Sequence, residues 1–243
     1  MTKRLLSLCA GLCLLAACSV APAGVTVHDP YEAQNRRVHA FNKSVSDTFT
    51  GGDSGGGMAV PSDFTDRVVK FGDNVGLPGM VVNGVLQGDA DGAITNAVRF
   101  LINTTVGVAG LFDPAGAIGL EEQETDFGET LAVWGVPEGA YLELPVLGPT
   151  TERAFAGRIV DMIIDPLGDV GTASQIKYGT GAKFAGRLIK AGQASDTIDS
   201  VLNDSADSYA QLRLIYLQNR RFELGTTPAT DAIDPYDDLF GDR

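Results

Sequence analysis

Apolar residues recur at helical spacing in the segment that follows Asp29-Pro30. They fall on one face of a helix, and basic residues fall on the other face. Asp29 can cap this helix, and Pro30 suits its first turn. The pattern predicts an amphipathic helix with an apolar face made of Tyr31, Val38, Phe41, Val45 and Phe49.

A second helix is expected to begin at Ser62 and to carry its apolar residues on one face. Because proline and glycine interrupt helices, Leu77-Pro78-Gly79 is expected to end it. The stretch 80–87 then forms a separate short apolar segment that contains Asn83.

The most hydrophobic stretch after residue 17 runs from 93 to 112, in a helix that Asp89 can cap. Arg99 and the polar run 103–105 interrupt it. A membrane span needs about 20 predominantly apolar residues. We therefore expect this segment to be either core or embedded in one leaflet.

The second half of the chain also favours helices. An acidic stretch at 121–129 leads into an apolar segment, and 141–145 is short and β-compatible. Helical patterns follow from Thr150-Thr151 to Pro166, from 172 to 202, and in a last helix that carries Tyr209. Helix dominates, with little or no sheet.

The first residues form a secretory signal. Lys3 and Arg4 precede an apolar run that is too short to span a bilayer, and the run ends in Leu15-Ala16-Ala17-Cys18. This ending looks like the lipobox of bacterial lipoproteins, in which the cysteine is acylated. Several acyl chains on Cys18 would hold the protein firmly in a membrane.

The net charge and the number of cysteines exclude several classes of function. The chain has 18 basic and 31 acidic residues, and removal of residues 1–17 leaves 16 basic residues and a net charge of −15. Such a surface repels phosphate backbones, so we expect no nucleic-acid partner. Cys18 is the one cysteine beyond the signal, so a disulfide framework and a thiolate metal site are excluded.

The sequence offers little evidence for a catalytic or metal-binding site. His28 and His39 show no serine, cysteine or carboxylate arrangement in the sequence that indicates an activated nucleophile. Asp89-Ala90-Asp91-Gly92 lacks the other ligands of a calcium loop, and the acidic run 121–129 is typical of a solvated loop. We expect no enzyme activity, no metal and no cofactor.

Five blocks, in order, resemble the MlaA (VacJ) family of outer-membrane lipoproteins. The opening block includes Phe41-Asn42, and the closing block ends at Arg220. Leu77-Pro78 and Asp207-Ser208-Tyr209 depart from the usual family residues, as does the glycine-rich loop 51–57. The blocks lie at 29–42, 83–115, 126–136, 139–149 and 208–220.

The resemblance implies an all-α, ring-shaped bundle of amphipathic helices that lies in one leaflet. It implies an amphipathic channel, a neighbouring trimeric outer-membrane porin and a soluble periplasmic lipid carrier. The implied function is to remove mislocalised phospholipids from the outer leaflet, which maintains lipid asymmetry. The alternatives are a structural, porin-associated lipoprotein without transport activity and a periplasmic hydrolase.

The expected organisation is a signal peptide at 1–17, a lipidated linker at 18–28, an MlaA-like helical domain at 29–225 and an acidic disordered tail at 226–243. Cys18 is the predicted lipid-attachment site. Phe41 is expected either to help set the channel gate or to lie in the core. Polar residues in apolar surroundings either line the channel or satisfy backbone groups. The channel or gate candidates are Phe41, Asn42, Asn83, Gln87 and Asn103.

Overall fold

The computed structural model describes residues 27–50, 62–164 and 207–225. Cys18, the loop 51–57, the helical pattern at 172–202 and the acidic tail lie outside the described residues. The described part is mostly helical.

The first described helix, α2 (Glu32–Thr50), follows Asp29-Pro30 as predicted. The predicted apolar face of this helix is not buried as a core face would be, because Tyr31 and Phe41 are about half exposed. Asp29 binds the side chains of Asn35, Tyr209 and Arg213 rather than the first turn of α2.

The expected break at Pro78 is wrong. Helix α3 (Ser62–Gln87) continues through Pro78 and includes the segment 80–87. Leu77 is buried where α3 contacts its neighbours. Packing along the whole helix therefore outweighs the local cost of one proline.

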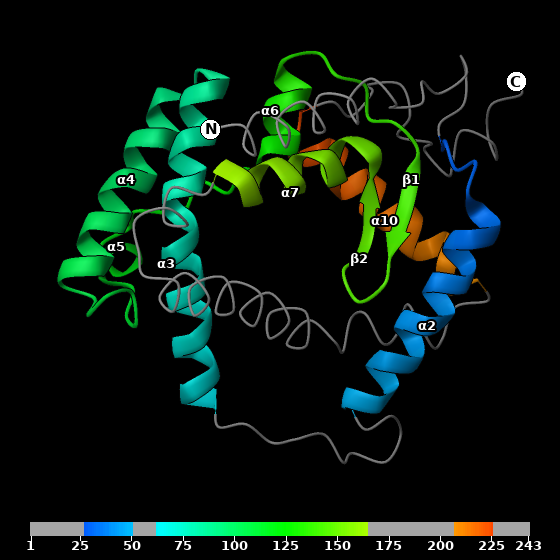
Figure 1. Ribbon diagram of the computed structural model, residues 1–243. Helices are drawn as coiled ribbons and strands as arrows, with labels where there is room; N and C mark the ends of the chain where they lie inside the picture. The colour runs from blue at the N-terminus through cyan, green and yellow to red at the C-terminus, as the bar shows by residue number, and fades with distance from the viewer. Residues whose placement is uncertain (1–26, 51–61, 165–206, 226–243) are drawn as a thin grey trace, which may run out of the picture.

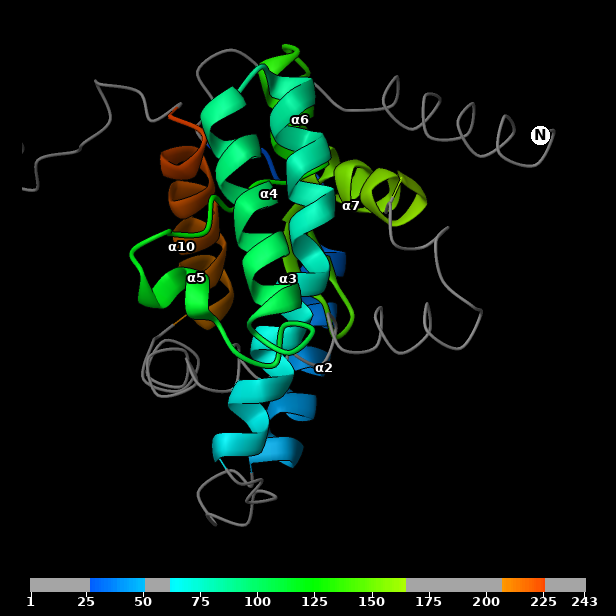
Figure 2. The same ribbon diagram turned by 90° about the vertical axis from the view of Figure 1, so that its left-hand side faces the viewer.

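Helix α4 (Ala90–Thr105) begins where the sequence predicts, with the Asp89 carboxylate accepting a hydrogen bond from the Gly92 N–H at 3.0 Å. It runs antiparallel to α3, and both views show the two helices side by side (Figures 1 and 2). The one-turn helix α5 (Pro114–Ala117) follows a loop at 106–112. In that loop Val108 and Ala109 have φ values of 55° and 59°, which cost about 1–2 kcal/mol each.

Helices α6 (Phe127–Val133) and α7 (Glu152–Ile164) flank a hairpin of strands β1 (Tyr141–Leu144) and β2 (Gly148–Thr151). Tyr141 pairs with Thr151 in the antiparallel register. We expected little or no sheet, and the described residues contain one small two-stranded hairpin. Gly157 allows α7 to approach α6 closely, because a Cβ there would lie 2.2 Å from the Gly128 nitrogen.

The last described helix, α10 (Ser208–Glu223), lies near the hairpin and α2. In Figure 1 the described elements form an arch. The α3–α4 pair with α5 is on one side and α2 is on the other, and α6, α7, the hairpin and α10 lie between them. No helix in the described ranges is both long and apolar enough to cross a membrane.

The buried residues of the described ranges are unusually polar. One apolar cluster joins Phe127, Leu131 and Ala156 of α6 and α7, and another joins Tyr141, Tyr209 and Leu217. Apart from these clusters, many of the buried side chains are polar and belong to asparagine, threonine, arginine, histidine and glutamate. Buried polar groups need partners, so their hydrogen bonds define how the helices join.

Candidate functional site

An apolar stripe runs along the outer face of α4. Ile94, Val98 and Leu101 recur at intervals of four and three residues, and they are 62%, 38% and 62% exposed. Val106, directly after the helix, is 70% exposed. We call these four residues the α4 stripe. A helix of a water-soluble protein normally turns such a stripe toward the core.

The opposite face of α4 is polar and buried. The Arg99 guanidinium forms an ion pair with the Asp113 carboxylate at 3.1 Å. The Asn103 Nδ2 donates to Asp113 at 2.8 Å, and the Asn103 Oδ1 accepts from the Ala115 N–H at 3.1 Å. Asn96 exchanges two hydrogen bonds with the Gln123 backbone. This α4 junction fastens α4 to α5 and to the segment 113–123.

The pKa of Asp113 reflects this environment. Burial alone would raise it, but hydrogen bonds from the Gly116 N–H, Asn103 and Arg99 outweigh burial and lower the pKa below its ordinary value. The charged carboxylate is therefore the form that holds the junction together.

Helix α2 contacts the hairpin through polar side chains at helical spacing. The Asn35 amide donates to the Tyr141 carbonyl at 3.1 Å and accepts from the Glu143 N–H at 3.0 Å. The Asn42 amide donates to the Leu144 carbonyl at 3.0 Å and accepts from the Val146 N–H at 2.7 Å. These side chains satisfy backbone groups of β1, which an additional strand would otherwise pair, and of the turn that follows β1.

His39 lies between Asn35 and Asn42 on the same face of α2. Its Nδ1 is 3.1 Å from the Glu143 Oε1, and its Nε2 is 3.0 Å from the Ser208 Oγ. The sequence shows no serine or carboxylate arrangement around either histidine, whereas the fold gives His39 one partner of each kind. Glu143 and Ser208 lie 104 and 169 residues farther along the chain, so only folding brings them to His39. Asn35, His39, Asn42, Glu143 and Ser208 form the α2 junction.

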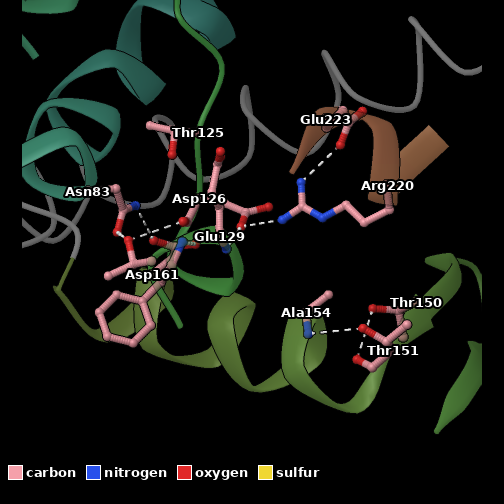
Figure 3. Close-up of polar contacts among 12 residues, drawn as sticks. Asn83, Thr125, Asp126, Glu129, Thr150, Thr151, Ala154, Asp161, Arg220 and Glu223 are labelled. Carbon is pink, nitrogen blue, oxygen red and sulfur yellow. Dashed lines mark hydrogen bonds and ion pairs between the residues drawn. The ribbon is translucent and has the colours of Figure 1, made fainter. Parts of the chain in front are cut away.

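The third group, the α6 junction, joins α3, α6 and α7. The Asn83 Nδ2 donates to the Asp161 Oδ1 at 2.8 Å, and the Thr130 hydroxyl donates to the Asn83 Oδ1 at 3.1 Å. The Gln87 Nε2 donates to the hydroxyls of Thr125 and Thr130 at 2.7 and 2.9 Å. Figure 3 shows Asn83 and Asp161 turned toward each other within this group.

Arg220 of α10 extends the α6 junction (Figure 3). Its guanidinium lies 2.6 Å from the Asp126 carboxylate and 3.0 Å from that of Glu223. Burial alone would lower the pKa of Arg220, but these carboxylates raise it above the ordinary value. Burial raises the pKa of the neighbouring Glu129 carboxyl. The junction therefore combines a cation held by two carboxylates with a carboxyl whose pKa is raised by burial.

The predicted channel or gate residues fall into these groups. Asn42 belongs to the α2 junction, Asn83 and Gln87 belong to the α6 junction, and Asn103 belongs to the α4 junction. Phe41 is 50% exposed and is not core. The role of these residues in a channel stays a prediction, whereas their contacts join helices to one another.

Sequence reasoning missed Asn35, Asn96 and Arg99 as a set. The signal was present, because polar residues at 35, 39 and 42 and at 96, 99 and 103 repeat every three or four positions. Such a repeat marks one face of a helix as clearly as an apolar repeat does.

Within the described ranges, no group of three or more histidine, cysteine, aspartate or glutamate side chains is placed to hold a metal ion. Taken together, the fold and the three junctions define a class of protein. It is an α-helical protein whose helices join through buried polar side chains and present apolar side chains outward.

The chain belongs to the MlaA lipoprotein family, whose sequence profile matches residues 27–223. It is 30% identical to the Escherichia coli protein named intermembrane phospholipid transport system lipoprotein MlaA, over 91% of this chain and 89% of that protein. A Haemophilus influenzae protein of the same name is 30% identical, over 81% of this chain and 79% of that one. An uncharacterized Rickettsia bellii protein is 35% identical, over 80% and 76% of the two chains.

A solved structure described as "Structural basis for maintenance of bacterial outer membrane lipid asymmetry" contains a similar chain. The two share 28% identity with a TM-score of 0.60, and the match covers 81% of this chain and 98% of that chain. The family resemblance expected from the five blocks is confirmed, and with it the expectation of a non-enzymatic protein.

Proposed function

We propose that this chain is a lipid-anchored outer-membrane protein that removes mislocalised phospholipids from the outer leaflet. It passes them through an amphipathic channel to a soluble periplasmic carrier. The family match supports this proposal, since relatives along most of the chain carry the name of an intermembrane phospholipid transport lipoprotein.

The α4 stripe is the single observation that carries the proposal. From Ile94 to Val106 it extends about 18 Å, because a helix rises about 1.5 Å per residue. The hydrocarbon of one leaflet is about 15 Å thick, half of a bilayer core of about 30 Å. The stripe therefore has the length that contact with the acyl chains of one leaflet requires.

Two features explain how such a protein stays in the membrane. Acyl chains at Cys18 supply the anchor in this proposal, and the α4 stripe supplies apolar contact. Electrostatic attraction to anionic lipid is weak for a mature chain with a net charge of −15. The hydrophobic effect must therefore dominate the attachment.

Transport in this proposal follows a lipid gradient and needs no nucleotide. A ring of amphipathic helices in one leaflet gives the headgroup a wet path and spares it the transfer into hydrocarbon, which costs several kcal/mol. Asn83, Gln87 and Asn103 fix the helices around that path, and Phe41 and Asn42 set its gate where α2 meets the hairpin. A trimeric porin beside the ring is the proposed partner.

A complementation experiment tests the proposal. In a host that lacks its own protein of this family, the wild-type gene should lower surface-exposed phospholipid and sensitivity to detergent with chelator. Cys18→Ala should fail because the anchor is lost, whereas Cys13→Ala, within the signal, should still complement. Unchanged outer-leaflet composition with the wild-type gene would overturn the proposal. Restored porin association without lipid movement would indicate a structural role instead.

A further inference from the structure

The N-terminal part of α3 carries two cations that form no ion pair with any described residue. They are Arg67 and Lys70, three residues apart and both exposed. The described arginines of α10, by contrast, are all paired with carboxylates. In a chain with a net charge of −13, two unpaired neighbouring cations are an exception.

An exposed apolar loop lies beside these cations. The Arg67 guanidinium sits 4.3 Å from the centre of the Phe112 ring, a cation–π contact that fixes its position. Stacking uses the face of the guanidinium and leaves its N–H groups available for an anion. Val106, Val108, Leu111 and Phe112 of the loop are 38–70% exposed.

The loop is held firmly in this position. The Ala109 N–H donates to the Thr104 carbonyl at 2.9 Å, and the Gly110 N–H donates to the Asn103 carbonyl at 2.8 Å. Gly110 has a φ of +91° and lies so close to Asn74 of α3 that a Cβ would lie 2.5 Å from the Asn74 Cβ. The loop and α3 therefore form one surface.

We infer that Arg67, Lys70 and the loop residues Leu111 and Phe112 form a phospholipid contact site. The phosphate is bound by the guanidinium of Arg67 and the ammonium of Lys70, and the acyl chains lie against the loop. Charge complementarity selects the phosphate, and the adjacent apolar side chains select a lipid over a free anion. This inference rests on the proposed function and adds the residues that contact the transported phospholipid.

The site can be tested by fluorescence. In a Trp134→Phe background, Phe112→Trp introduces a single tryptophan at the loop, since Trp134 is the only tryptophan of the chain. The acylated protein is placed in vesicles of phosphatidylethanolamine and phosphatidylglycerol with brominated acyl chains. Bromine should quench this tryptophan strongly, while a tryptophan placed at Gln211, an exposed position of α10, should be quenched weakly.

The phosphate contact needs a separate readout. Phosphorus NMR with labelled arginine should place a lipid phosphorus next to the Arg67 guanidinium in wild-type protein, and Arg67→Gln should abolish that signal. The pair Arg67→Gln/Lys70→Gln should lower the rate of lipid transfer by about tenfold, since each interfacial cation contributes an appreciable free energy. Arg37→Gln, which removes an exposed cation of α2, should leave the transfer rate unchanged.

The outcomes of these experiments distinguish a failure of the phospholipid contact site from a failure of the proposed transport function. If inorganic phosphate produces the same phosphorus signal in lipid-free detergent, the site binds free phosphate and the inference is wrong. Absent quenching at residue 112 together with normal lipid transfer would also overturn the inference and leave the proposed function standing. Wild-type protein that transfers no lipid at all would overturn the proposed function.

Discussion

Helices α4 and α6 have similar hydrophobic content and bury opposite kinds of residue. Helix α6 buries Phe127 and Leu131 against Ala156 of α7, as a helix in water does. Helix α4 exposes Leu101 and buries Arg99. The proposed function gives the two helices different surroundings, water and protein for α6 and hydrocarbon for α4. A helical pattern identifies a face, but only the surrounding solvent decides which face turns inward.

The largest expected effect is at the polar face of α4. Arg99→Leu should lower the free energy of unfolding by about 3–5 kcal/mol, because it leaves the Asp113 carboxylate partly buried without its cation. Urea or thermal unfolding in detergent measures the change. Arg37→Leu, on an exposed position of α2, is the control. Equal stabilities of the two variants would contradict a buried polar face on α4.

Two leucine-to-alanine variants compare the apolar faces of α6 and α4 directly. Leu131→Ala should cost about 2–5 kcal/mol, because Leu131 is 1% exposed in the core of α6 and α7. Leu101→Ala removes the same atoms from a residue that is 62% exposed, and it should change stability by no more than about 0.5 kcal/mol in detergent. Similar losses for both variants would mean that Leu101 lies in a core.

Much of the fold could be predicted from sequence. The start of α4 at Asp89 and the existence of α2, α7 and α10 follow from caps and spacing, which are local signals. The continuation of α3 through Pro78 could not be predicted, because it depends on packing along the whole helix. The hairpin partners of Asn35 and His39 lie more than 100 residues away, so no local pattern reveals them.

The Asp113 carboxylate predicts a pH dependence of the α4 junction. Its folded-state pKa is lowered, so its contribution to stability is complete above the unfolded-state pKa, near 4. That contribution is lost as the pH falls from about 4 through the folded-state pKa. Asp113→Asn should lower stability at pH 7 by about 1–3 kcal/mol and remove this part of the acid dependence. Unfolding measured at several pH values checks this, and a variant with the wild-type pH profile would contradict it.

The smallest expected loss of stability at a junction residue is at Ser208. Its hydroxyl is aligned with His39 and Glu143, but the chain belongs to a non-enzymatic family, so the contacts are expected to fasten α2 to β1 and α10. Ser208→Ala should cost about 1 kcal/mol for the lost hydrogen bond. A fluorophosphonate probe should not label the wild-type protein, as mass spectrometry would show. Stoichiometric labelling of Ser208 would contradict the assignment.

The orientation of α4 can be measured by spin labelling. Because Cys18 is the only cysteine after the signal and is proposed to be acylated, a single added cysteine can carry the label. Labels at Ile94, Val98 and Leu101 in a bilayer should be accessible to oxygen, which dissolves in hydrocarbon, and protected from a water-soluble nickel complex. A label at exposed Glu124 should show the reverse preference. Nickel access along the whole α4 stripe, equal to that at Glu124, would contradict contact between α4 and the membrane.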